Sequence, residues 1–118
     1  MKEDNILAEK SSDFAVRTVN CYKFLSQEKK EFVMSKQLYK SGTSIGANIH
    51  EGLQAQSKPD FISKMGIALK EASETSYWLN LLVRTEYISQ KMFESLLTDC
   101  DELSRLLTAI IKSSRENK

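Results

Sequence analysis

Residues 38–52 read LYKSGTSIGANIHEG. Apolar and small residues recur in this stretch at alternating steps of four and three positions, namely Leu38, Gly42, Ile45, Ile49 and Gly52. That spacing puts them along one side of an α-helix, as in the seam between two paired helices. A glycine inside a helix costs about 1 kcal/mol relative to alanine. We therefore expect Gly42 and Gly46 to let the next helix, at 58–86, pack closely. A phosphate-binding loop is not favoured, because no Gly-Lys-Ser/Thr run follows a strand.

Three other segments have the periodicity of amphipathic helices. Together with the segment around residues 38–52, they predict four helices, over residues 6–25, 30–53, 58–86 and 90–112. Ser57, followed by Pro59 and Asp60, is typical of a helix start, and Ser89 is expected to cap the last helix. Four amphipathic helices with short connections predict an all-α fold, an antiparallel up-down-up-down four-helix bundle that forms a single domain over 1–118.

The composition gives no global signal for a partner. The 118 residues include 17 Lys and Arg against 16 Asp and Glu, a net charge of +1, so a nucleic-acid site would have to be local. Cys21 and Cys100 have no metal-site or disulfide-framework spacing and are expected to be reduced and buried. The start does not resemble a signal peptide, and no apolar run is long enough to span a membrane. We expect a cytoplasmic protein with no membrane partner and no cofactor.

A polar stripe runs beside the apolar seam and faces two acidic residues of the next helix. We interpret this set as a structural polar layer that fixes helix register: Ser44, Asn48, Glu51, Glu71 and Glu74. An antiparallel hairpin that turns near 55–56 sets Glu71 level with Lys40. Because an unpaired buried carboxylate is costly, the sequence predicts a Lys40–Glu71 ion pair partly inside the bundle.

The rival interpretation of these carboxylates is a metal site. Di-metal bundles use two Glu-x-x-His motifs with two further glutamates. This chain has a single histidine, His50, and it follows no such glutamate. The same scarcity of histidine argues against a nucleophilic triad. We therefore predict no metal ligands and no catalytic residues.

A local basic cluster lies between residues 23 and 40, where five lysines oppose two glutamates and give a charge of +3. Tyr22, Phe32 and Tyr39 interleave with the lysines. Lysines can contact phosphates, and aromatic rings can stack on exposed bases. The candidate nucleic-acid-binding residues are Lys29, Lys30, Lys36 and Lys40. The alternative is an ordinary solvated face near a loop.

Several ordered motifs match a known bacterial family. They are SGTSIGANI at 41–49 with Glu51 after it, SKPDFI at 57–62, IALKEA at 67–72, ET at 74–75 and YWLNLL at 77–82. This chain resembles the 23S rRNA intervening-sequence proteins. The resemblance implies a four-helix bundle that assembles as a ring, a homopentamer, with no known catalytic residues. It is also similar to accessory proteins of diversity-generating retroelements, which implies binding of nucleic acid and a reverse transcriptase.

The leading hypothesis is thus a non-catalytic oligomeric bundle that associates with RNA. Candidates for a subunit contact are Phe24, Phe32, Tyr77 and Tyr87. The alternatives are a nucleic-acid-binding (RNA or DNA) accessory subunit of a reverse transcriptase complex and a carboxylate-metal bundle enzyme.

Overall fold

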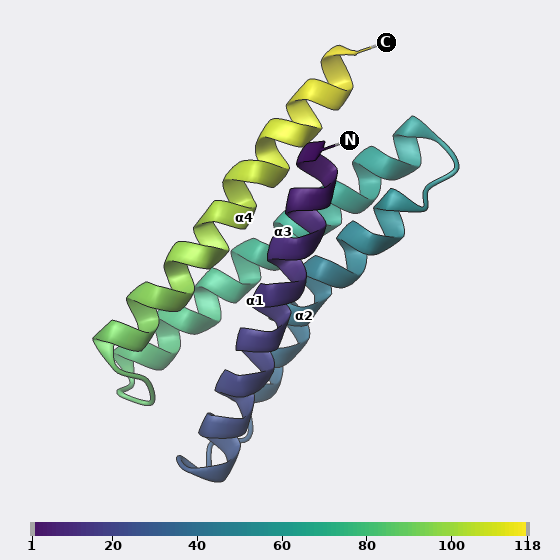
Figure 1. Cartoon of the computed structure of the whole chain (residues 1–118). Coiled ribbons are helices and arrows are strands. Elements are labelled where there is room, and N and C mark those ends of the chain that lie inside the picture. The colour runs from purple at the N-terminus through teal and green to yellow at the C-terminus, as the bar shows by residue number, and fades with distance from the viewer. Residues whose placement is uncertain (1, 118) are drawn as a thin grey trace.

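A computed structural model describes residues 2–117, with side chains from residue 5 onward. The described residues form four helices, α1 (Lys2–Gln27), α2 (Met34–Leu53), α3 (Lys58–Arg84) and α4 (Gln90–Glu116). They pack as an antiparallel bundle of 49 × 21 × 19 Å (Figure 1). The α1–α2 and α3–α4 connections lie at one end, and the α2–α3 connection lies at the other (Figure 1). The predicted four-helix fold is confirmed.

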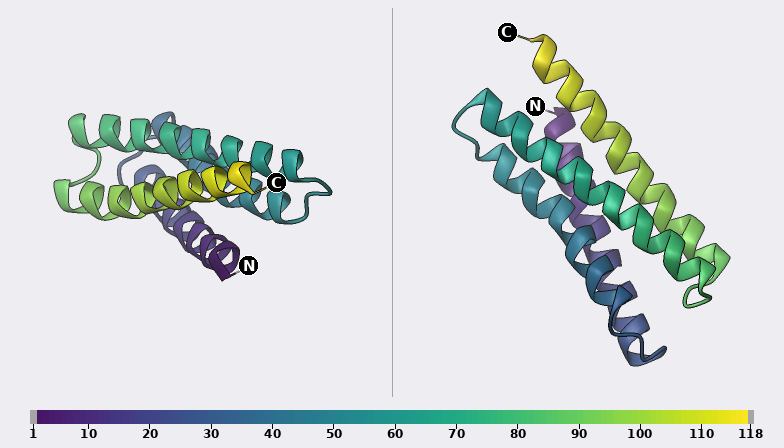
Figure 2. Two further views of the ribbon diagram at one scale, coloured as in Figure 1. Left: turned by 90° about the horizontal axis from the view of Figure 1, so that it is seen from above. Right: turned by 180° about the vertical axis from the view of Figure 1, so that it is seen from behind.

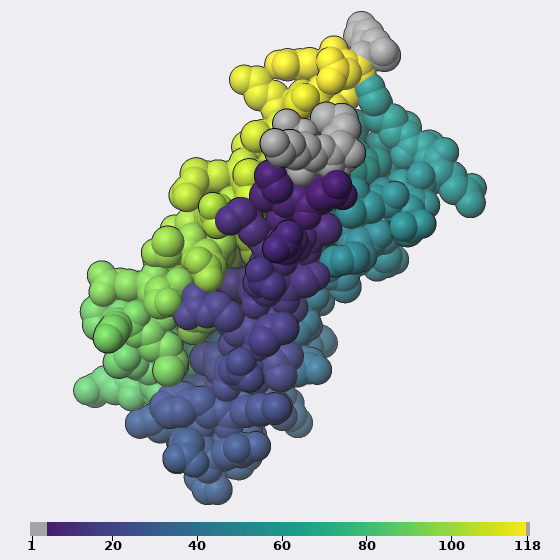
Figure 3. Space-filling model, viewed as in Figure 1, coloured from purple at the N-terminus to yellow at the C-terminus, as the bar shows by residue number. Residues whose placement is uncertain are grey.

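Each helix packs against its neighbours in the chain, and α1 and α4 close the bundle through a less extensive contact. Seen from above, α1 leans away from the other three helices (Figure 2). The space-filling view shows α1 along the front, between α4 and α2 (Figure 3). In the described part of the chain α1 and α3 make no close backbone contact, so they lie diagonally across the bundle.

Polar side chains bridge α1 and α4 at the surface. The Arg17 guanidinium donates to the Asp99 carboxylate at 2.6 Å and to the Ser95 hydroxyl at 2.8 Å. The Lys10 ammonium donates to the Glu102 carboxylate at 3.3 Å. Apart from the guanidinium–Asp99 bond, which is part-buried, these contacts are exposed, so salt screens them.

The helix ends follow local capping. Ser57 Oγ accepts from the Asp60 N–H at 3.2 Å, and Ser89 Oγ accepts from the Met92 N–H at 3.1 Å, so both predicted caps are confirmed. Helix α3 stops at Arg84 rather than 86, because Glu86 takes a left-handed φ of 67° and the Tyr87 N–H turns back to the Leu82 carbonyl at 2.9 Å. The outer helices are longer than predicted, reaching Lys2, Gln27 and Glu116.

The core is a continuous apolar column contributed by all four helices. Its largest fully buried apolar side chains are Leu7, Phe14, Leu25, Leu38, Ile45, Ile49, Met65, Leu79, Leu82, Leu103 and Leu107. Cys21 and Cys100 are buried free thiols, as expected. Burial raises the pKa of Cys21 to about 11 and that of Cys100 to about 12, so neither thiol ionises near neutral pH.

The three glycines of α2 sit at close helix contacts, but for two of them the predicted neighbour was wrong. A Cβ on Gly42 would lie 2.5 Å from side-chain atoms of Thr18, and one on Gly46 would lie 3.3 Å from the Ser11 carbonyl oxygen. Both contacts are with α1, not α3. Gly52 alone faces α3, where a Cβ would lie 2.6 Å from the Met65 methyl carbon. Both neighbours share the glycine side of α2: α1 contacts it at Gly42 and Gly46, and α3 contacts it at Gly52.

Gly42→Ala should destabilise the protein. The clash with Thr18 should cost about 1–3 kcal/mol, partly offset by a gain of about 1 kcal/mol in helix propensity. We expect a net loss of up to about 2 kcal/mol in the free energy of unfolding, measured by urea denaturation. Adding Thr18→Ala should recover part of the loss.

Gly66→Ala is the matched control, because a Cβ there meets nothing within 4 Å. It should leave stability unchanged or raise it by up to about 1 kcal/mol. Equal losses at the two positions would contradict the close-packing explanation.

Candidate nucleic-acid interface

Glu31 organises the turn between α1 and α2. Its carboxylate accepts from the N–H groups of Val33, Met34 and Ser35 at 3.1, 3.0 and 2.7 Å. The Ser35 hydroxyl donates to the Glu31 carbonyl at 2.8 Å. These bonds satisfy N–H groups at the start of α2 that have no partner within the helix. Helix α2 therefore begins at Met34, not at residue 30 as predicted, and Lys30 takes a left-handed φ of 54° to enter the turn.

The environment of Glu31 favours its charged form. The residue is only 8% exposed, and burial of the carboxyl raises its pKa. Hydrogen bonds from the Ser35, Met34 and Val33 N–H groups outweigh that effect and hold the pKa below its ordinary value of 4.5. The carboxylate also lies at the N-terminus of α2, where the helix dipole favours negative charge.

The same turn directs apolar and basic side chains outward. Phe32 is 53% exposed and Val33 is 73% exposed. Lys29, Lys30 and Lys36 are exposed around them, and none forms a salt bridge with a side chain that the structure describes. We call residues 29–36 the basic turn.

Two further predicted residues adjoin the basic turn. Lys40, one helical turn beyond Lys36, is exposed. Tyr39 is exposed as well, and its ring meets that of Tyr22 edge-on, with centroids 5.1 Å apart. The structure thus brings all four candidate lysines and two of the three interleaved aromatics, Phe32 and Tyr39, to the surface at one end of the bundle.

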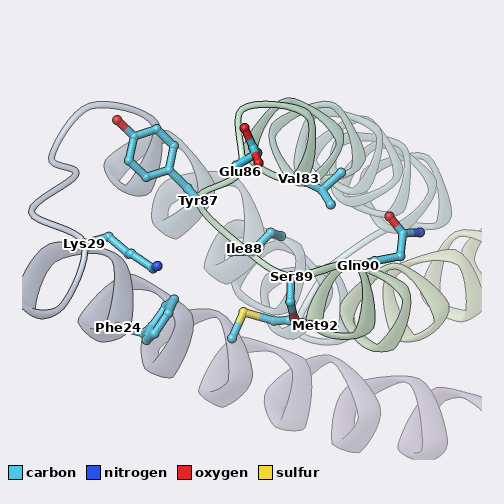
Figure 4. Close-up of a pocket in the computed structure, with 9 residues that line it drawn as sticks. All are labelled: Phe24, Lys29, Val83, Glu86, Tyr87, Ile88, Ser89, Gln90 and Met92. Atoms are coloured by element: carbon cyan, nitrogen blue, oxygen red, sulfur yellow. Dashed lines mark hydrogen bonds between the residues drawn. The ribbon is translucent and has the colours of Figure 1, made fainter.

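A hollow of about 500 Å³ lies beside the basic turn, between the end of α1 and the α3–α4 connection (Figure 4). Its lining residues are Phe24, Lys29, Val83, Glu86, Tyr87, Ile88, Ser89, Gln90 and Met92. The Lys29 ammonium lies 5.7 Å from the centre of the Phe24 ring. Phe24 and Tyr87 were candidates for a subunit contact, but both are partly buried against the core.

The predicted polar layer between α2 and α3 is not a buried network. Ser44 and Asn48 are half-buried and bond to carbonyls of their own helix, those of Lys40 and Ser44. Glu51 is exposed and lies 3.7 Å from the Lys64 ammonium, and Glu74 is exposed. These stripes lie at the edge of the helix pair, where side chains reach solvent.

The buried polar contact between α2 and α3 comes from smaller side chains. The Thr75 and Ser41 hydroxyl oxygens lie 2.9 Å apart, and Thr75 donates to the Glu71 carbonyl at 2.8 Å. Small hydroxyl side chains fit the inner side of the helix pair and can bond to backbone there. No pattern in the sequence pairs Ser41 with Thr75.

The predicted Lys40–Glu71 ion pair does not form among the described side chains. Burial raises the pKa of Glu71, and the nearby Glu74 carboxyl raises it further; Lys70 and Lys40 lower it less. The positive charge of Lys40 is therefore close enough to act on Glu71 without contacting it. A flexible, strongly hydrated ammonium gains little from an exposed pair and stays in solvent.

His50 is exposed, and its Nδ1 lies 2.8 Å from the Gly46 carbonyl of the same helix. Among the residues described, no three His, Cys, Asp or Glu side chains gather closely enough to hold a metal ion. None of the described helices has the length and apolar character needed to cross a membrane.

A protein-family model identifies the family of this chain. The model for the 23S rRNA-intervening sequence protein family matches residues 3–109. The chain belongs to this family. The family match confirms the resemblance seen in residues 41–82 and extends it over α1 and most of α4.

A solved structure supports the same conclusion. The crystal structure of a protein of unknown function from the S23 ribosomal protein family of Bacteroides thetaiotaomicron shares 62% identity and a TM-score of 0.93 with this family member. The alignment covers 93% of this chain and 98% of the other. No curated protein matches the chain.

Glu31→Ala should lower the free energy of unfolding by about 1–2 kcal/mol at pH 7, because it removes a helix cap and leaves N–H groups unsatisfied. The folded-state pKa lies below the unfolded value, so this stabilisation is present above pH 4.5 and is lost as pH falls through the folded-state pKa. Urea denaturation at several pH values should show the two proteins converging in acid.

Glu28→Ala is the control, since Glu28 is exposed in the same connection. It should change stability by less than about 0.5 kcal/mol. A Glu31→Ala deficit that persists undiminished well below pH 4 would show that the carboxylate charge is not what caps α2.

Proposed function

We propose that this chain is a non-catalytic, oligomeric four-helix bundle that binds RNA through the basic turn and Lys40. The observation that supports this most is the exposure of Lys29, Lys30, Lys36 and Lys40 together, without salt-bridge partners among the described side chains. Charges that are not paired internally remain available to phosphates.

The position of Glu31 strengthens the proposal. Its carboxylate points inward and is bound by three N–H groups, so it does not pair with the surrounding lysines. The positive charge of the turn is therefore presented outward. The chain as a whole has a net charge of only +1, which favours local binding at this end over general attraction to polyanions.

Exposed apolar side chains on two helices support self-association. On α1, Val16 is 59% exposed and Ile6, ten positions earlier, is exposed; on α3, Tyr77 is 58% exposed and Ile67, ten positions earlier, is exposed. Helices α1 and α3 lie diagonally across the bundle, so the surfaces around Val16 and Tyr77, here called the α1 patch and the α3 patch, are separate. A contact between two different patches is heterologous and forms a closed ring when the rotation between copies fits.

A ring would strengthen RNA binding. Rotational symmetry places every copy of the basic turn at the same rim, so a weak site on one subunit becomes a multivalent one. The homopentamer implied by the family resemblance would present the lysine cluster five times.

RNA binding can be tested by fluorescence anisotropy with a structured RNA at several salt concentrations. Lys36→Glu with Lys40→Glu should weaken binding at least about tenfold and reduce the slope of log K against log salt by roughly 2, because two phosphate contacts are lost. Lys58→Glu with Lys112→Glu, which makes the same charge change at exposed sites toward the other end of the bundle, should have little effect. Absence of binding at low salt would overturn the proposal.

Self-association can be tested by sedimentation at micromolar concentration. The monomer mass is 13.5 kDa, so a pentamer should sediment at about 68 kDa. Tyr77→Arg and Val16→Arg should each prevent ring closure, whereas Thr98→Arg on the exposed side of α4 should not. Mixing the first two variants should give a dimer of about 27 kDa, because one intact patch of each remains compatible. A wild-type monomer would refute the ring.

A further inference from the structure

Phe32 is a large apolar side chain exposed on a part of the chain that is tightly held. The Glu31 N–H donates to the Leu25 carbonyl at 2.9 Å, which anchors the turn to the end of α1. On the other side, the Glu31 carboxylate binds the N–H groups of Val33 to Ser35. Phe32 lies between these anchors, so its backbone is fixed while its ring stays accessible.

The ring has no aromatic or cationic partner within the described residues. The aromatic pairs there are Tyr22 with Tyr39 and Tyr77 with Trp78. The nearby Lys29 ammonium lies over Phe24 instead. A ring face of Phe32 is therefore available to a planar partner.

We infer that Phe32 stacks on an unpaired RNA base while neighbouring lysines, Lys30 and Lys36 first, contact the adjacent phosphates. This inference rests on the proposed RNA binding and names its target class, RNA with unpaired nucleotides rather than continuous duplex. In a duplex the base faces are covered by their neighbours, whereas single-stranded segments leave them free for aromatic side chains. Because the backbone is already ordered, little entropy is lost when the ring is engaged.

The charge around Phe32 favours nucleic acid over an apolar protein partner. Lysine is depleted in the cores of protein–protein interfaces, because burying its ammonium is costly. Lys29, Lys30 and Lys36 flank the Phe32–Val33 pair in the sequence and are exposed, so an apolar partner seated on this turn would desolvate them. Phosphates next to a stacked base would instead match these charges.

The test compares a short unstructured RNA with the duplex that it forms with its complement, by anisotropy on the full chain. Phe32→Ala should weaken binding of the unpaired RNA about 5- to 100-fold, which is the range for loss of one stacked base. Phe32→Leu, which keeps apolar bulk without an aromatic face, should weaken it similarly, and Phe32→Tyr should restore it. Duplex affinity and salt slope should stay unchanged, because the lysines remain.

The controls separate the possible failures. If no RNA binds at low salt, the proposed function itself is wrong. If both RNAs bind with the expected salt dependence but the Phe32 variants do not differ, the stacking inference alone is overturned. It is also overturned if Phe32→Ala changes the sedimenting mass, or if it reduces binding to phosphatidylserine vesicles but not to RNA.

Discussion

The hydrogen bonds from three consecutive backbone N–H groups to the Glu31 carboxylate set the geometry of this bundle end. They decide where α2 begins and hold the reversal between α1 and α2 at a fixed length. That reversal sets the register of the two helices, which brings Gly42 opposite Thr18 and Gly46 opposite Ser11. The Glu31 carboxylate thus helps to determine which residues of α1 lie opposite the glycines of α2, several helical turns away from the turn itself.

The fold was largely predictable from the sequence because apolar periodicity and helix caps are local signals. The seam that includes Leu38 and Ile45, and the caps Ser57 and Ser89, needed no knowledge of the rest of the chain. The start of α2 was missed because its cap comes from Glu31, ahead of the helix. The sequence signal that could have located this helix start is Glu31, which lies four positions before Ser35 and just upstream of the apolar seam.

The site was predictable only in part. The lysine cluster is close in sequence, so its members had to lie near one another in space. The prediction of a polar layer was wrong because residue type does not reveal how far a side chain can reach. Glu51 and Glu74 extend to solvent from the edge of the helix pair. Ser41 and Thr75 are too short to reach solvent, so they bond to each other between the helices. The partner of Gly42 depended on which of its two neighbouring helices that face of α2 meets, and no local pattern encodes that choice.

The contact between α1 and α4 differs in kind from the others. It is less extensive and includes the Arg17–Asp99 and Lys10–Glu102 pairs, of which the latter is exposed. Exposed charge pairs weaken as ionic strength rises, whereas apolar contacts hold no charge for salt to screen. Local opening of the bundle should therefore begin at the contact between α1 and α4. Opening there should require less free energy than opening at the glycine contacts between α1 and α2. Raised ionic strength would make that opening more frequent while leaving the other three helix contacts intact.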